Sequence, residues 1–198
     1  MLALDHTELI QSLIDKNDFH RYLEIGVDRG INFAAVRCDL KVGVDPAPTS
    51  AATHKVTSDD FFASDDREWD LIFIDGLHHA DQVVRDVDNA LACLAAGGVI
   101  VCHDLNPTSE RMQRVPRVSV IWTGDCWRGW VELRARPGLD MRVIDTDFGC
   151  GVITRGEGIV VEVDEPLTYA GLEANRKEWL NLVTVDEWLA DTGHALAR

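Results

Sequence analysis

Apolar residues in this chain form two kinds of run that alternate along the sequence. Short continuous runs at 69–74 and 99–102 are typical of strands that are covered on both faces. Between them, apolar residues recur at helical spacing over 82–94, which predicts an amphipathic helix. Strands that alternate with helices predict an α/β fold with a mainly parallel sheet and right-handed crossovers.

The same reading extends to the rest of the chain. The other expected strands are 21–27, 41–45, a weak one at 54–57, and an antiparallel hairpin of 139–144 and 149–154 at one edge of the sheet. The other expected helices are 5–17, 31–37, 125–134, 172–182 and 185–196. Residues 95–98 are expected to form a helix stop and turn, and 118–122 a short strand or helix.

The charge and composition of the chain limit the classes of molecule that it can bind. A formal net charge of -15 argues against nucleic acids and anionic membranes. No apolar run approaches the roughly 20 residues of a membrane span, and the first ten residues lack the pattern of a secretory signal. The five cysteines are scattered without a CxxC pair, which favours a reduced, cytoplasmic protein. Assembly into a homo-oligomer stays open.

Residues 23–30, LEIGVDRG, connect an expected strand to an expected helix. Gly26 and Gly30 would let the backbone turn tightly and approach a ligand. Asp45 ends the next strand, where a carboxylate can accept from ribose hydroxyls. The GxGxxG spacing of dinucleotide sites is missing, and Glu24 suits a cationic ligand better than a pyrophosphate. An ordinary strand-to-helix turn is the plain alternative.

A second constellation follows the two buried strands at 69–74 and 99–102. Asp75 and Asp104 end these strands, which should be neighbours about 4.8 Å apart. Two carboxylates at that distance repel unless a cation or proton intervenes. Mg²⁺ suits oxygen ligands, and His103 would tilt the site toward Mn²⁺. The alternative is that these are solvated strand ends with loop histidines beside them.

The succession LEIGVDRG, VGVDP, TSDDFF, DLIFIDG and GGVIVCHD resembles class I S-adenosylmethionine-dependent methyltransferases over about residues 20–155. DGLHH followed by GGVIVCHD is most similar to the bacterial metal-dependent sugar O-methyltransferases of the macrocin and mycinamicin type. The resemblance implies a doubly wound, Rossmann-like, seven-stranded sheet with an antiparallel last strand. It implies one methyltransferase domain over 1–198, with an N-terminal helix in 1–20, a cofactor-binding core at 21–155 and a helical tail at 157–198.

The resemblance also assigns residues to roles. In this family, His78 would be the general base beside Asp75, and Asp75, His103 and Asp104 would hold the metal. His103 stands where the family has Glu, which either changes the preferred metal or marks a lost site. Asp28 stands where a glycine is usual, which affects the loop conformation. The implied cofactor-binding residues are Glu24, Gly26, Asp28, Gly30, Asp45, Ser58, Asp59 and Asp75.

The function that these features favour is O-methylation of a small-molecule hydroxyl, of sugar or natural-product type, with S-adenosylmethionine as cofactor and Mg²⁺ or Mn²⁺ as helper. Methyl transfer without a metal, an NAD-type oxidoreductase and a non-catalytic cofactor-binding protein are the alternatives.

Two further features lie beyond the second constellation. Trp122, Trp127 and Trp130 could border the acceptor site or pack in the core or an interface, and packing is the favoured interpretation. The arginine-rich loop 106–117 could be a lid or a solvated loop.

Overall fold

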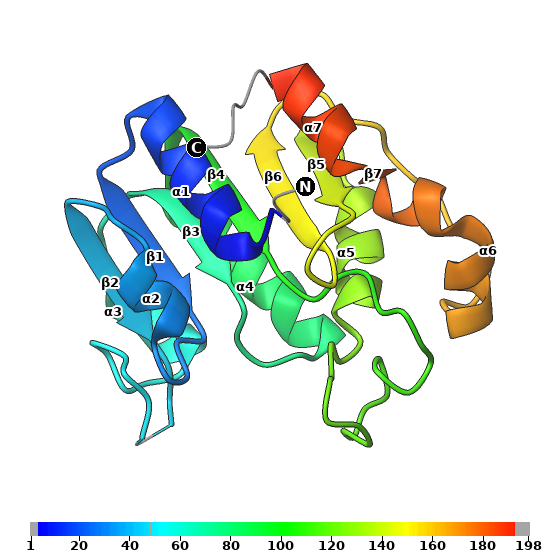
Figure 1. Cartoon of the computed structure of the whole chain (residues 1–198), viewed down its shortest axis with the longest axis horizontal. Helices are drawn as coiled ribbons and strands as arrows, with labels where there is room; N and C mark the ends of the chain where they lie inside the picture. The colour runs from blue at the N-terminus through cyan, green and yellow to red at the C-terminus, as the bar shows by residue number, and fades with distance from the viewer. Residues whose placement is uncertain (1–3, 48, 193–198) are drawn as a thin grey trace.

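A computed structural model describes residues 4–47 and 49–192, which form a seven-stranded sheet with helices on both faces (Figure 1). The strand order is β2-β1-β3-β4-β6-β5-β7. The strands are β1 (Arg21–Ile25), β2 (Leu40–Val44), β3 (Trp69–Ile74), β4 (Leu94–Cys102), β5 (Leu139–Ile144), β6 (Cys150–Arg155) and β7 (Leu182–Val183).

One strand, β6, runs against the others. It pairs antiparallel with both β4 and β5, and the remaining pairs are parallel. The predicted Rossmann-like fold class is therefore confirmed. The hairpin of β5 and β6 is present, but the two-residue β7 pairs with β5 and takes the edge position. The antiparallel strand is thus the last of the long strands.

The helices are α1 (His6–Asn17), α2 (Ile31–Ala35), α3 (Ser58–Ser64), α4 (Ala80–Cys93), α5 (Cys126–Arg134), α6 (Tyr169–Leu180) and α7 (Val185–Thr192). Side chains cap two of these helices: the Asp5 side chain accepts from the Glu8 amide at 2.8 Å, and Thr184 and Glu187 cap each other. The expected last residues of α7, 193–196, lie outside the described part of the chain.

Side chains of β3 and β4 alternate between two apolar layers. Phe73 and Val101 pack on the α1 side with Leu9 and Ile10, whereas Ile74 packs on the opposite side against α4 and α5. Alternation is the geometric rule for a strand, because successive side chains point to opposite faces. The rule matters for the site, since both strands end in polar residues.

Three local expectations were wrong. Residues 54–57 form only an isolated bridge between His54 and Val44, because Thr57 already caps α3. Residues 95–98 belong to β4, since pairing with β3 continues past Gly97 through a register shift. Residues 118–122 form neither strand nor helix, and Val120 is 88 % exposed, so no packing stabilises a regular element there.

Within the described ranges, no helix combines the length and the apolar character that a membrane span requires.

Candidate active site

A cavity of about 740 Å³ lies at the carboxyl ends of β1, β2 and β3. This is where open α/β sheets bind their ligands. The lining includes residues from five segments of the chain: Ile25, Gly26, Asp28, Val44, Asp45, Pro46, Thr57, Ser58, Asp59, Asp75, Gly76, Leu77, His78, Gln82, Arg117, Val120 and Trp122. Most of the residues predicted to bind the cofactor are thus brought together, and the predicted base lies beside them.

Asp45 is held rigidly at the end of β2. Its Oδ2 accepts from the Asp28 amide at 2.8 Å, and its Oδ1 accepts from the Ala47 amide at 2.8 Å. A carboxylate has lone pairs for about four hydrogen bonds. Two backbone donors therefore orient the group and leave it able to accept from hydroxyls in the cavity.

The glycines of the 23–30 loop serve close packing. Gly26 has φ +90°, and a Cβ there would lie 2.0 Å from the Asp75 carbonyl oxygen. Gly26 therefore allows the end of β1 to rest against the end of β3. Gly30 has φ +76° and lies over Ala51, which a Cβ would approach to 2.6 Å. Within the described chain, Gly30 is not among the residues that line the cavity.

Glu24 is also set back from the cavity. Its side chain is buried, and its Oε2 accepts from the Tyr22 hydroxyl at 2.5 Å and from Asn32 Nδ2 at 2.8 Å. Burial disfavours the charged carboxylate and, although these two hydrogen bonds oppose it, raises the pKa of Glu24 to about 7. Its predicted contact with the cofactor stays a prediction.

Glu24→Gln should flatten the pH dependence of stability. The folded-state pKa of about 7 lies above the ordinary value of 4.5, so this group's stabilising contribution is complete below pH 4.5 and is lost as the pH rises through 7. Between pH 5 and pH 8 the wild type should lose about 2–3 kcal/mol more unfolding free energy than Glu24→Gln. Urea unfolding at several pH values measures this, with the exposed Glu157→Gln as control; parallel curves for Glu24→Gln and wild type would contradict it.

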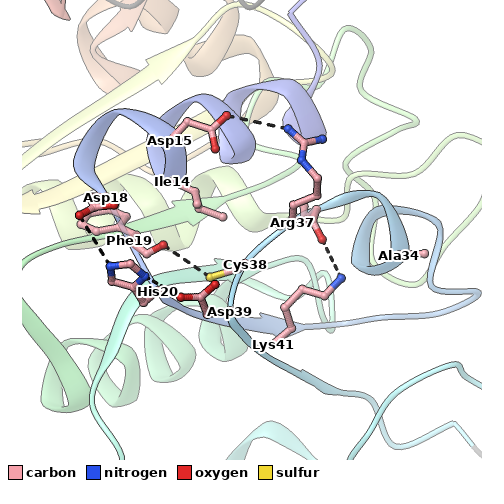
Figure 2. A pocket seen from close by; sticks show the side chains of 11 residues that line it. Ile14, Asp15, Asp18, Phe19, His20, Ala34, Arg37, Cys38, Asp39 and Lys41 are labelled. Carbon is pink, nitrogen blue, oxygen red and sulfur yellow. Dashed lines mark hydrogen bonds and ion pairs between the residues drawn. The ribbon is translucent and has the colours of Figure 1, made fainter.

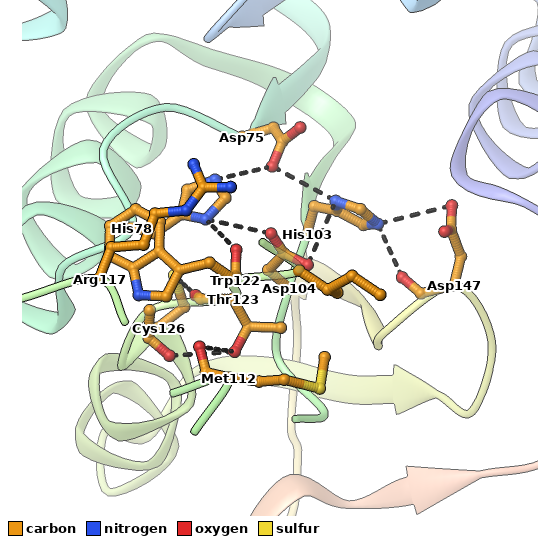
Figure 3. A network of polar contacts seen from close by, with 12 residues as sticks. Asp75, His78, His103, Asp104, Met112, Arg117, Trp122, Thr123, Cys126 and Asp147 are labelled. Carbon is orange, nitrogen blue, oxygen red and sulfur yellow. Dashed lines mark hydrogen bonds and ion pairs between the residues drawn. The ribbon is translucent and has the colours of Figure 1, made fainter. Parts of the chain in front are cut away.

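Asp75 and His78, which line the cavity, lie next to Asp104, which follows β4 (Figure 3). His78 Nε2 lies 3.4 Å from Asp75 Oδ1, and His78 Nδ1 lies 3.1 Å from Asp104 Oδ2. The Nδ1–H also donates to the Trp122 carbonyl at 3.1 Å, and the two rings stack with centroids 5.2 Å apart. The imidazole is therefore fixed on both edges and one face.

Charge interactions shift the protonation of this group. Burial lowers the pKa of His78, but Asp75 and Asp104 outweigh burial and raise it above its usual value. For Asp75, burial alone would raise the pKa. Hydrogen bonds with His103 and His78 outweigh burial and hold the pKa of Asp75 well below its usual range. Burial, reinforced by Asp75, raises the pKa of Asp104 to about 6 despite the nearby imidazoles. Asp75 and Asp104 thus favour the protonated form of the His78 imidazole, so this ring must lose its proton before it can accept one from a substrate.

The group of potential metal ligands differs from the predicted set in one member. Ligand atoms of Asp75, His78 and Asp104 all lie within 4.8 Å of one another, whereas His103 groups with His6 and Asp147. His103 is two residues after Val101, so its side chain points to the same face of the sheet. Its ring therefore contacts Phe73 on the α1 side. Strand alternation is the signal that could have separated His103 from Asp104.

The tryptophans divide between core and cavity. Trp127 and Trp130 are fully buried, and Trp127 stacks on Trp179 with centroids 6.1 Å apart, so the core interpretation is confirmed for them. Trp122 lines the cavity instead, with the Arg117 guanidinium 5.7 Å from its ring. Arg117 belongs to the loop that was predicted as a lid or a solvated segment.

A second hollow, of about 680 Å³, lies at the amino ends of β1 and β2 (Figure 2). Its polar groups are bonded to one another or to the backbone. Lys41 Nζ donates to the carbonyls of Phe33 and Val36 at 2.6 Å, and His20 pairs with Asp39 at 2.8 Å. It therefore presents no converging set of free polar groups comparable with the first cavity.

Comparisons with solved structures define the class of fold. The chain is 15% identical to the Bacillus cereus O-methyltransferase in complex with S-adenosylhomocysteine (SAH), with a TM-score of 0.56 and 74% and 78% of the two chains covered. It is 18% identical to the SAH-bound methyltransferase PaMTH1 of Podospora anserina (TM-score 0.56, coverage 76% and 76%). It is 18% identical to TomG of Streptomyces achromogenes, an O-methyltransferase of tomaymycin synthesis in complex with S-adenosylmethionine (TM-score 0.58, coverage 78% and 82%). At these identities the similarity establishes the fold.

Sequence comparison gives a match over part of the chain. Residues 45–105 match the family model of a methyltransferase domain. No curated protein matches the sequence significantly. The solved methyltransferases thus establish the fold, and the family model covers 61 of the 198 residues.

Proposed function

We propose that this protein is an S-adenosylmethionine-dependent O-methyltransferase of a small-molecule hydroxyl, assisted by a divalent metal and using His78 as the base. The observation that carries the proposal is a single cavity that joins Asp45 to the Asp75–His78 pair. One end offers a carboxylate for ribose hydroxyls, and the other offers an imidazole for the acceptor's proton.

The charge of the cavity favours this cofactor over a dinucleotide. Four aspartates line it, namely Asp28, Asp45, Asp59 and Asp75. A wall of carboxylates attracts cations and repels anions. S-adenosylmethionine carries a sulfonium and an ammonium group, whereas NAD carries a pyrophosphate. The lining therefore fits the former.

The chemistry is a direct displacement. The acceptor oxygen attacks the methyl carbon, the carbon–sulfur bond breaks with its electrons leaving on sulfur, and the hydroxyl proton passes to the His78 imidazole. Positioning of the two reactants supplies much of the rate, and proton acceptance by a well-placed imidazole adds to it. Asp75 orients the ring through its 3.4 Å contact with Nε2 and stabilises the imidazolium that forms.

The cluster at the cavity wall fits a divalent ion. Asp75 and Asp104 supply two carboxylates with oxygens within 4.8 Å of each other, and such oxygen ligands suit Mg²⁺ or Mn²⁺, while His78 is left to accept the proton. Such an ion, when bound, would lower the pKa of a coordinated hydroxyl. Asp104, next to the His78 ring, would help to hold it.

Cofactor binding should depend on Asp45. SAH should raise the melting temperature of the wild type and NAD should not. Asp45→Ala should weaken SAH binding by about 10- to 100-fold, because a hydrogen bond to a charged group contributes about 1.5–3 kcal/mol. Calorimetric titration measures the affinity, with the exposed Asp66→Ala as control. Stabilisation by NAD alone would overturn the proposal in favour of an oxidoreductase.

Metal removal should lower turnover. Dialysis against EDTA should reduce methyl transfer, and Mg²⁺ or Mn²⁺ should restore it in the wild type but not in Asp104→Asn. Release of SAH in the presence of a panel of sugar and phenolic acceptors measures the rate. Undiminished activity in EDTA would remove the metal from the mechanism while leaving methyl transfer in place.

A further inference from the structure

A second cluster of ligating side chains lies outside the cavity, on the α1 side of the sheet. His6, His103 and Asp147 each offer one ligand atom, and these atoms all lie within 4.8 Å of one another. The residues come from the start of α1, the end of β4 and the β5–β6 loop. None of the three lines the cavity, so the proposed function leaves this cluster unexplained.

The spacing of the ligand atoms suits a small ion. His103 Nε2 lies 3.5 Å from Asp147 Oδ2, and His6 Nδ1 lies 2.5 Å from the same oxygen. The imidazole rings of His6 and His103 have centroids 4.7 Å apart. Ligand atoms around a tetrahedral zinc ion, with bonds of about 2.0–2.1 Å, are separated by roughly 3.3 Å. Small side-chain movements therefore suffice to surround an ion.

The far nitrogen of His103 has the partner that metal-bound histidines usually have. Its Nδ1 lies 3.3 Å from Asp75 Oδ1. A histidine that ligates a metal generally donates its other ring N–H to a carboxylate or carbonyl, which fixes the ring's orientation. Asp75 thus turns Nε2 of His103 toward Asp147, where Nε2–H donates to the backbone carbonyl at 2.7 Å, and a bound ion would replace this proton.

The loop that carries Asp147 is held in an unusual backbone conformation. Asp147, Phe148 and Gly149 have φ of 45°, 59° and 96°. Two consecutive non-glycine residues in the left-handed region each cost about 1–3 kcal/mol, and such strain clusters at ligand sites. A Cβ at Gly149 would lie 2.5 Å from the Asn106 amide nitrogen, so the loop packs tightly against the residues that follow β4. The conformation presents Asp147 to both histidines.

An ion could reach the cluster from solvent. The side chains of His6 and Asp147 are 25% and 24% exposed, and that of His103 is 10% exposed. The cluster is thus neither sealed in the core nor spread over the surface.

We propose that His6, His103 and Asp147 bind one Zn²⁺ ion, at a site distinct from the cavity cluster. Two imidazoles and one carboxylate form a donor set typical of zinc and its transition-metal neighbours, and unlike the all-oxygen sets of Mg²⁺. The site does not depend on methyl transfer, so it can fail or stand independently of the proposed function.

The test uses the full chain in an Asp104→Asn background, which removes one ligand of the cavity cluster. Metal-free protein is titrated with Zn²⁺ by calorimetry and with Co²⁺ by visible absorption. We expect one Zn²⁺ per chain in Asp104→Asn. Adding His6→Gln or Asp147→Asn should weaken binding by about tenfold or more and abolish the Co²⁺ spectrum. Adding His20→Gln, at an exposed histidine outside the cluster, should leave both unchanged.

Three results would overturn the proposal. The first is an absence of Zn²⁺ binding to the folded Asp104→Asn protein. The second is unchanged affinity in both double variants, which would place the ion elsewhere. The third is Zn²⁺ binding by the wild type that is lost in Asp104→Asn alone, which would assign the ion to the cavity. Circular dichroism establishes that each variant is folded, and the isosteric Asp147→Asn serves if His6→Gln is unstable.

Discussion

Methyl transfer by His78→Gln should be about 10²- to 10⁴-fold slower than by the wild type, because the variant lacks the imidazole that we propose accepts the hydroxyl proton. Gln has similar length and hydrogen-bonding capacity but does not titrate. The affinity for SAH should stay near that of the wild type, since Asp45 and the 23–30 loop are unchanged. Release of SAH under single-turnover conditions measures the loss.

His79→Gln is the matched control for this prediction. His79 is the N-cap of α4 and has no side-chain capping bond, and it is not among the residues that line the cavity. Its replacement should leave the rate close to the wild-type value. A His78→Gln enzyme that keeps the full rate at neutral pH would show that the imidazole is not the base.

Gly124→Ala should disturb the same site without changing any side chain in it. Gly124 has φ +58°, and a Cβ there would lie 1.8 Å from the His78 carbonyl oxygen. Because backbone atoms on both sides would have to move, we expect a loss of about 3–5 kcal/mol in unfolding free energy, at the upper end for single substitutions. Methyl transfer should fall as well, since His78 is displaced from Asp75.

Gly138→Ala is the control that distinguishes the steric contact of a new Cβ from the strain of a positive φ. Gly138 also has a positive φ, +86°, but a Cβ there would meet nothing within 4 Å. Its replacement should cost only the conformational strain, about 1–2 kcal/mol, with activity retained. Urea unfolding compares the two variants, and equal losses would show that the contact with His78 contributes nothing.

The regular part of the fold could be predicted from the sequence because burial sets its pattern. The apolar runs at 69–74 and 99–102 became β3 and β4, and the helical spacing at 82–94 became α4. The hydrophobic pattern did not predict the elements whose structure depends on tertiary contacts. At Gly97 the sheet continues through a glycine that usually ends an element, and the two-residue β7 exists only because β5 offers it an edge.

The site could be predicted in part for a similar reason. Strand ends locate Asp75 and Asp104 at the same edge of the sheet, and His78 follows in the adjoining loop. The sequence alone does not reveal the turn at Asp104, where φ is 62°. His6 and Asp147 were missed because they approach His103 from segments 97 and 44 residues away in the chain, as their positions give (103 − 6 and 147 − 103).

The walls of the cavity come from separate stretches of chain. Residues 25–59 and 75–82 carry the aspartates, whereas Arg117, Val120 and Trp122 come from a stretch without regular structure. Substitutions of Arg117 and Val120 should be tolerated by the fold, because no sheet or helix hydrogen bonds depend on these side chains, whereas Trp122 stacks on the His78 ring. During evolution, residues of this wall can change, and with them the substrate that fits the cavity, while the aspartates of the opposite wall are kept. Chains descended from one ancestor could thus bind the same cofactor and differ in the substrate that they accept.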